Sequence, residues 1–218
     1  MHAAALALML ANLGPGSVVA VIGMPGTGKT RAVQAAESRG ELGRRIVFDP
    51  YGARDRTLAR QGDKVTPWPG QLVTLRQLAT NVHLLRAGNL RLVVAPSSLD
   101  PEKMGAEFAD LAELAWAQGR LTVVAEEAAL YGRACVPAIL RVASGGRHAG
   151  LRLVLVCQSI GRLPIDARRH LTAVVAHAQG EPQDLDDIRR RCGADFTTRV
   201  QALRVGDAPA IWRIGDSQ

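Results

Sequence analysis

The stretch GMPGTGKT at positions 23–30 has the residue types and the spacing of a phosphate-binding loop. It satisfies the pattern G-x-x-x-x-G-K-[ST], whose glycines let backbone N–H groups wrap around a phosphate. Lys29 would reach the β- and γ-phosphate oxygens of a nucleotide, and the Thr30 hydroxyl would bind Mg²⁺. We therefore predict that a nucleoside triphosphate with Mg²⁺ contacts a continuous set of residues: Gly23, Met24, Pro25, Gly26, Thr27, Gly28, Lys29, Thr30 and Arg31.

Two glutamates follow an apolar run in LTVVAEEAAL, at positions 121–130. At the carboxyl end of a parallel strand, Glu126 would hold Mg²⁺ through a water molecule. Glu127 would act as the base that polarises the attacking water. The alternative is that both acids begin a helix over EEAALYG, since acids favour helix N-termini. The phosphate loop upstream favours the catalytic interpretation.

Three further side chains are candidates for the same chemistry. Gln158 ends the next apolar run, where its amide could bridge the γ-phosphate and the water on Glu127; the alternative is a core or turn glutamine. Arg147 and His148 lie in GGRHAG, which predicts a glycine-flanked turn. From such a turn Arg147 could reach a neighbouring subunit as an arginine finger, or it could be a solvated surface residue. Asp49 ends the run RRIVFDP, and the following proline and glycine favour a turn there.

The elements that must position these residues alternate along the chain. Apolar, β-branched runs predict strands at 17–23, 44–50, 90–96, 121–127, 151–159, 172–178 and 208–214. Helical patterns lie between them at 30–38, 74–86, 101–118, 136–144 and 183–193. The polar stretch after Asp49, up to position 71, has little periodicity. Strands that are apolar on both faces, alternating with helices, predict an α/β fold with a mostly parallel sheet covered by helices.

Composition is consistent with one compact domain and an anionic partner. The 218 residues are 47% hydrophobic and 22% charged, with a net charge of +7 and a pI near 10.1. Arginine carries this charge, and arginine suits bidentate phosphate contacts. We predict a single domain over 1–218, with a helical lead-in (1–16), a core (17–195) and a C-terminal extension that ends in a strand (196–218).

Several classes of protein are disfavoured by what the sequence lacks. The three cysteines are far apart and form no CxxC pair, so neither zinc binding nor disulfides are expected. The N-terminal apolar run has no basic region before it and is followed too soon by the phosphate loop to be a secretory signal. No apolar run is long enough for a transmembrane segment. A signalling GTPase would carry an N-K-x-D element, and a P-loop kinase an arginine-rich lid, and neither pattern is present.

The order GMPGTGKT, IVFDP, LVVAP, LTVVAEEA and GRHAGLRLVLVCQSIGRLP resembles the FtsK/HerA superfamily of ring-forming, DNA-pumping ATPases. Within it, the chain looks most like the small genome-packaging ATPases of tailless, membrane-containing phages and related viruses. The resemblance covers roughly residues 17–195. It implies a P-loop NTPase fold of the ASCE or RecA-like type, with an antiparallel strand at the C-terminal edge.

The resemblance also implies roles and partners. Residues 23–30 would be Walker A, Glu126 and Glu127 Walker B, Gln158 the sensor glutamine and Arg147 a trans-acting arginine. The protein would hydrolyse ATP to move double-stranded DNA into a capsid, as a homo-oligomeric ring, expected to be a hexamer. It would dock on a capsid vertex or a membrane-associated portal protein, in the host cytoplasm or on the virion rather than in a secreted form. One departure is Glu126, where the family usually has aspartate.

Two other functions are compatible with parts of the sequence. The PGTGKT spelling also occurs in AAA+ remodelling ATPases, but these need a helical lid, and the short segment after Gly180 ends in a predicted strand. A nucleotide-binding assembly subunit with little turnover is the other alternative, and Glu126 in place of aspartate is the only hint of it. The candidate DNA-contacting cations are Arg162, Arg168, Arg169 and Arg189–Arg191. The alternative is that these arginines lie on a solvated helix face and contact no DNA.

Overall fold

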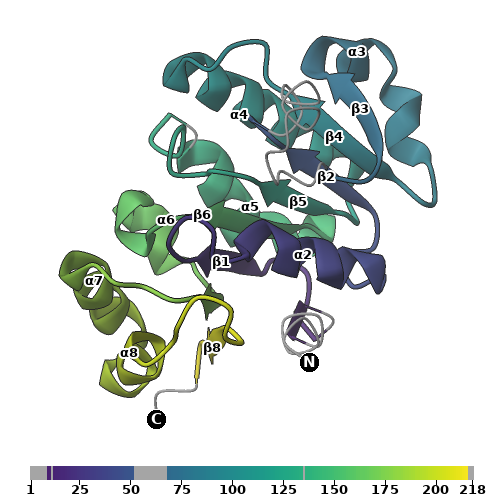
Figure 1. Cartoon of the computed structure of the whole chain (residues 1–218). Helices are drawn as coiled ribbons and strands as arrows, with labels where there is room; N and C mark the ends of the chain where they lie inside the picture. The colour runs from purple at the N-terminus through teal and green to yellow at the C-terminus, as the bar shows by residue number, and fades with distance from the viewer. Residues whose placement is uncertain (1–8, 11, 52–67, 135, 216–218) are drawn as a thin grey trace, which may run out of the picture.

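The computed structural model describes residues 9–10, 12–51, 68–134 and 136–215. Its centre is an eight-stranded sheet in the order β3-β4-β2-β5-β6-β1-β7-β8 (Figure 1). All neighbouring strands are parallel except β8, which pairs antiparallel with β7. The predicted α/β fold with a mostly parallel sheet and an antiparallel C-terminal edge is therefore confirmed. The strands are β1 Val18–Ile22, β2 Arg45–Phe48, β3 Gln71–Thr74, β4 Arg91–Ala95, β5 Thr122–Ala125, β6 Arg152–Cys157, β7 Ala173–Ala176 and β8 Ala210–Arg213.

Helices cover both faces of the sheet, which is why the central strands are apolar throughout. Along β1, Val18 and Ala20 pack into one core with α4 and α5, whereas Val19 and Val21 pack into a second core with α2. All five residues of β1 are buried. The α-helices are α2 Lys29–Ser38, α3 Leu75–Thr80, α4 Pro101–Gln118, α5 Val136–Ala149, α6 Ile165–Arg169, α7 Pro182–Cys192 and α8 Ala194–Gln201, and the 3₁₀ turns are η2 Val82–Arg86 and η3 Ile160–Arg162.

The region predicted as one helix over 74–86 is a short helix and a 3₁₀ turn, and the strand β3 that ends at Thr74 just before them was not predicted. β3 is a half-exposed edge strand, so it lacks the continuous apolar run that marks the central strands. Thr74 ends β3 and caps α3: its hydroxyl accepts from the Gln77 N–H, and the Gln77 side chain accepts from the Thr74 N–H. The helices α6 and α8 were not predicted either, because short, polar helices carry little periodicity.

Two local predictions are wrong. The helix predicted at 136–144 continues to Ala149, so Arg147 and His148 lie in its last turn and not in a glycine-flanked turn. Glycines are needed inside this helix because other elements press against it: a Cβ on Gly145 would lie 2.5 Å from the Trp116 ring. The alternative helix over EEAALYG is also absent, since residues 126–133 form turns.

Two predictions fall partly or wholly outside the described residues. The helical lead-in over 1–16 includes residues 1–8 and 11, which are not described, although residues 9 and 10 are helical. Most of the polar stretch after Asp49, residues 52–67, is not described either. Among the helices in the described ranges, none has both the length and the apolar character needed to cross a membrane.

Candidate nucleotide-binding site

The phosphate loop connects the carboxyl end of β1 to the first turn of α2, as the motif requires. Gly28 caps α2 with φ of 90°, a left-handed conformation that strains residues with a side chain. Gly23 lies where any side chain would collide, because a Cβ there would be 2.7 Å from both the Cβ of His177 and the Oγ1 of Thr27. The loop therefore needs Gly28 for its left-handed backbone and Gly23 because no side chain fits there.

Lys29 is turned back into its own loop. Its Nζ donates to the carbonyl oxygens of Gly23 (2.8 Å) and Met24 (3.1 Å). The side chain is buried, and burial lowers its pKa, while the charges of Glu127 and Glu126 oppose that effect. The Lys29 ammonium is already removed from water, and only carbonyl oxygens hold it. Moving it onto phosphate oxygens would therefore require little further desolvation.

Glu126 touches the phosphate-loop helix through its side chain. The Thr30 hydroxyl donates to Glu126 Oε2 at 3.0 Å, and the indole Nε1–H of Trp68 donates to Oε1 at 3.1 Å. The residue is only 5% exposed. Burial, with the nearby charge of Asp49, raises its pKa to about 8, against the effect of the two hydrogen bonds. Trp68 was not predicted as part of the site, because it lies far from Glu126 in the sequence and no motif connects the two positions.

These residues fit a magnesium ion. A hydroxyl, a buried carboxylate that it touches and a second carboxylate nearby are the hard oxygen donors that Mg²⁺ prefers. The raised pKa of Glu126 means that its negative charge lacks compensation within the protein. A divalent cation beside Thr30 and Glu126 would supply that compensation.

Glu127 has a strained backbone. Its φ is 50°, in the left-handed region that costs a residue other than glycine roughly 1–2 kcal/mol. The turn that imposes this conformation is fixed by the Ala128 N–H, which donates to Val156 O at 2.9 Å, and by the Tyr131 hydroxyl, which donates to Glu126 O at 3.0 Å. Burial raises the pKa of Glu127, whereas the positive charges of Lys29 and Arg162 lower it. The Glu127 carboxylate is therefore close enough to the loop lysine for the two charges to act on each other.

Asp49 follows β2 and Gln158 follows β6, the two strands that flank β5 and its glutamates. The Asp49 carboxylate accepts from the Tyr51 N–H at 3.2 Å, which confirms the predicted turn. Its charge also raises the pKa of both glutamates, so it belongs to the same acidic group. Gln158 borders the phosphate loop through its backbone, since its carbonyl accepts from the Gly23 N–H at 3.1 Å.

Two residues of β7's carboxyl end were missed. His177 and Gln179 are 4% and 5% exposed. In the part of the chain that the structure describes, neither ring nitrogen of His177 has a well-aligned hydrogen-bond partner. The same is true of Gln179 Oε1. Burial, together with the charge of Lys29, lowers the pKa of His177 to about 4. The sequence could have indicated these two residues. The predicted strand in TAVVAHAQ ends in polar residues, just as the predicted strand that precedes Gln158 does.

The arginines occupy places that the sequence did not predict. Arg147 lines a hollow at the amino ends of the strands, so it is not near the phosphate loop of its own chain. Arg162, a candidate for DNA contact, lies close enough to Glu127 for its positive charge to lower the pKa of that carboxyl. Arg168 pairs with Asp187 at 3.5 Å, and Arg191 lies over the Trp212 ring at 4.8 Å. Within the described residues, much of this charge therefore joins α6, α7 and β8 to one another.

A parallel sheet with a phosphate loop after β1 and acids after β5 defines the P-loop NTPase fold. No protein-family model matches the sequence, and no curated protein sequence matches it either.

Solved structures do match over nearly the whole chain. The genome packaging NTPase B204 from Sulfolobus turreted icosahedral virus 2, in complex with sulfate, is 18% identical, with a TM-score of 0.67, covering 93% of this chain and 94% of its own. B204, the DNA-packaging ATPase from Sulfolobus turreted icosahedral virus, is 18% identical, with a TM-score of 0.63 and coverage of 92% and 98%. VirB4 of Thermoanaerobacter pseudethanolicus is 13% identical, with a TM-score of 0.60 and coverage of 94% and 91%. At these identities the similarity establishes the P-loop NTPase fold.

Proposed function

We propose that the protein binds ATP with Mg²⁺ at residues 23–31 and hydrolyses it. The contact that carries this proposal is the hydrogen bond between Thr30 and Glu126, with Glu127 next in the chain and close to Lys29. It joins the phosphate loop to the strand-end acids, as a metal-dependent NTP site requires. The structures of B204 with AMPPCP and with ATP-gammaS, on the same fold, support a nucleotide in this position.

Each residue has a defined part in the reaction. Lys29 exchanges the carbonyl oxygens of Gly23 and Met24 for phosphate oxygens when the nucleotide binds. Thr30 and Glu126 hold Mg²⁺, which when bound neutralises charge on the phosphate oxygens. The carboxylate of Glu127 accepts a proton from the water that attacks the γ-phosphorus. The Gln158 amide orients that water.

We further propose that hydrolysis drives movement along double-stranded DNA, in a homo-oligomeric ring that packages a viral genome. The DNA-packaging role of B204 and the net charge of +7 support this proposal. A packaging motor must grip any sequence, and phosphate-directed arginines suit that task. Arg147 can act as an arginine finger only on a nucleotide held by another subunit, because it lies at the opposite edge of the sheet from its own phosphate loop.

The test is steady-state phosphate release by the full chain, with and without double-stranded DNA. We expect the wild-type protein to hydrolyse ATP, and DNA to raise the rate. Lys29→Ala should lose nucleotide binding. Glu127→Gln should retain it but hydrolyse roughly 10²–10⁴-fold more slowly. Glu102→Gln, an exposed acid in the first turn of α4, is the matched control and should keep the wild-type rate.

One observation favours a second function, that of a nucleotide-binding assembly subunit with little turnover. Glu126 stands where similar proteins are expected to carry aspartate, and its side chain is held by Thr30 and Trp68 in a buried position where burial raises its pKa. ATP binding without DNA-stimulated hydrolysis by the wild-type protein would contradict the motor and select this alternative.

A further inference from the structure

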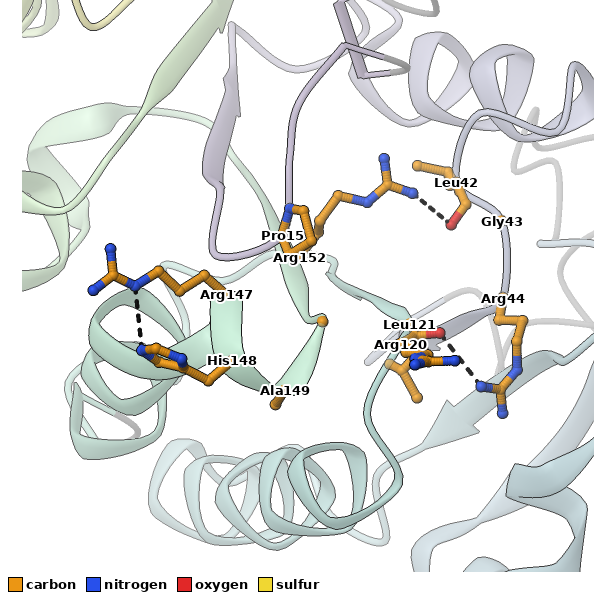
Figure 2. A pocket seen from close by; sticks show the side chains of 11 residues that line it. Pro15, Leu42, Gly43, Arg44, Arg120, Leu121, Arg147, His148, Ala149 and Arg152 are labelled. Carbon is orange, nitrogen blue, oxygen red and sulfur yellow. Dashed lines mark hydrogen bonds between the residues drawn. The ribbon is translucent and has the colours of Figure 1, made fainter.

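A basic pocket of about 530 Å³ lies at the amino ends of the strands. Figure 2 shows that its lining comes from the segments that enter β1, β2, β5 and β6 and from the last turn of α5. The nucleotide site lies at the carboxyl ends of the same strands, so the two sites are on opposite edges of the sheet. The lining includes the four arginines Arg44, Arg120, Arg147 and Arg152, and also His148, whose Nε2 accepts from Arg147 Nε at 3.3 Å.

No acid lines this pocket, and the arginine charges are not neutralised. Among the described residues, none of the four arginines forms an ion pair. Arg44 and Arg152 use their N–H groups on neutral carbonyl oxygens, such as those of Ala87 (3.1 Å) and Leu42 (3.0 Å). Glu41 is close enough to oppose the lowering of the Arg152 pKa that burial causes, but it is not part of the lining.

The pocket is also rigidly built. The Arg120 N–H donates to Ala149 O at 2.8 Å, which joins the entry of β5 to the end of α5. Arg120 itself has φ of 52°, a conformation that costs free energy in a residue other than glycine. A Cβ on Gly150 would lie 3.0 Å from the Arg120 Cγ, so the two segments touch closely. The entry of β5 and the end of α5 are thus held in close contact beneath the arginines of the lining.

We propose that this pocket binds a phosphate group. Arg120 and Arg147 offer forked N–H donors that match phosphate oxygens, and the charges of Arg44 and Arg152, whose N–H groups donate to protein oxygens, add to the positive potential of the lining. The volume is within the range of sites that hold a small ligand. The phosphate could belong to a free polyphosphate or to the backbone of DNA. Only the second source rests on the proposed function, and binding at the pocket does not depend on hydrolysis.

The experiment uses the full chain with Lys29→Ala, which removes phosphate binding at the nucleotide site. Tripolyphosphate and a short DNA duplex are titrated separately by calorimetry, and then in competition. Into this background we introduce Arg120→Gln with Arg147→Gln, two exposed arginines whose side chains support no other described element. Arg204→Gln, an exposed arginine in the segment between α8 and β8, is the control. Thermal melts verify that each variant is folded.

We expect binding by the Lys29→Ala protein to weaken at least about tenfold when Arg120 and Arg147 are replaced, and to change less than about twofold with Arg204→Gln. Tripolyphosphate binding without duplex binding identifies a free phosphate compound, and competition by the duplex identifies the DNA backbone. The proposal is overturned if neither probe binds the Lys29→Ala protein, or if the pocket variant binds as tightly as the control. A DNA motor that hydrolyses ATP normally while the pocket binds nothing would refute this inference alone.

Discussion

Glu126 and Glu127 are adjacent in the chain but are held in different ways. Glu126 is almost fully buried and hydrogen-bonded to Thr30 and Trp68. Glu127 has a left-handed backbone and lies close to Lys29. Strain of this kind persists only where the surroundings impose it, and it is common at functional sites. These different environments suit the different roles that we propose for the two carboxylates, Glu126 in holding a cation and Glu127 in accepting a proton from water.

The strain at Glu127 predicts that glycine is more stabilising than alanine at this position, which is the reverse of their usual order. Glu127→Gly should have a free energy of unfolding about 1 kcal/mol higher than Glu127→Ala, because glycine adopts positive φ without steric cost. Both variants should lack hydrolysis. At Glu113, inside α4, the order should be the usual one, with glycine about 1 kcal/mol less stable than alanine. Urea denaturation measures both pairs, and a Glu127→Gly protein less stable than Glu127→Ala would contradict the strain.

His177 predicts a dependence of stability on pH. Its pKa is about 4 in the folded protein against an ordinary value of 6.5, so between these values the unfolded chain binds the proton more readily. The free energy of unfolding should therefore fall as the pH is lowered through this range. Between pH 7 and pH 5 the wild-type protein should lose about 2 kcal/mol more than His177→Gln does.

The control for this pH effect is His170→Gln, at an exposed histidine, which should lose stability as the wild type does. Denaturation at both pH values gives the comparison. If wild type and His177→Gln respond equally to pH, His177 is not buried in its neutral form.

At the scale of elements, α2 is fixed to the sheet by a buried ion pair. Glu37 in the last turn of α2 pairs with Arg45 at the start of β2, and the two residues are 2% and 0% exposed. Arg45 also donates to Leu92 O at 3.2 Å, which extends the connection to β4. The helix that carries Lys29 and Thr30 is therefore held at its far end by charge and along its length by apolar contacts.

Breaking this pair should be far more costly than breaking an exposed one. Arg45→Met leaves the buried Glu37 carboxylate with only the half-exposed Arg91, whose Nε lies 3.8 Å from Glu37 Oε1, and should cost about 3–5 kcal/mol of unfolding free energy. Arg45→Met with Glu37→Gln should recover part of the loss. Arg141→Met breaks the pair between Arg141 and Glu113, which are both about half exposed, and should cost less than about 1 kcal/mol. Equal costs at the two positions would show that the buried pair is not structural.

The central elements could be predicted from the sequence because they are buried on both faces. β1, β5 and β6 are continuous apolar runs, and α4 begins at Pro101 and ends at Gln118, as its caps and periodicity predicted. The edge strand β3 has only one buried residue, so its pattern is too weak to detect. The two glycines in α5 were wrongly predicted to form a turn, since a sequence does not show that Trp116 packs against Gly145 and Gly16 against Gly146.

The site was predictable where one rule covers its residues. Polar side chains at the carboxyl ends of parallel strands converge, and this rule selected Glu126, Glu127 and Gln158. Trp68 escaped it because its contact with Glu126 depends on tertiary structure alone. Arg147 was predicted to be an arginine finger from its residue type and its flanking glycines. The sequence does not show which edge of the sheet the end of α5 reaches.

At the scale of the whole molecule, charge is sorted between the two edges of one sheet. Carboxylates gather at the carboxyl ends of the strands, beside the phosphate loop. Arginines that no described acid pairs with gather at the amino ends. The arginines of α6 and α7 are largely paired with Asp166 and Asp187. Within the described residues, arginine therefore has two separate uses, in ion pairs between helices and as unpaired cations around the pocket, where an anionic partner could bind.

The central claim is that ATP hydrolysis at Glu127 moves the protein along DNA. Displacement of a labelled triplex-forming strand from a DNA duplex measures this movement directly. We expect the wild-type protein to displace the third strand in the presence of Mg²⁺ and ATP, and Glu127→Gln to bind the same DNA and nucleotide without displacing it. Displacement that proceeds equally with Glu127→Gln, or no displacement by a wild-type protein that hydrolyses ATP on DNA, would contradict the account.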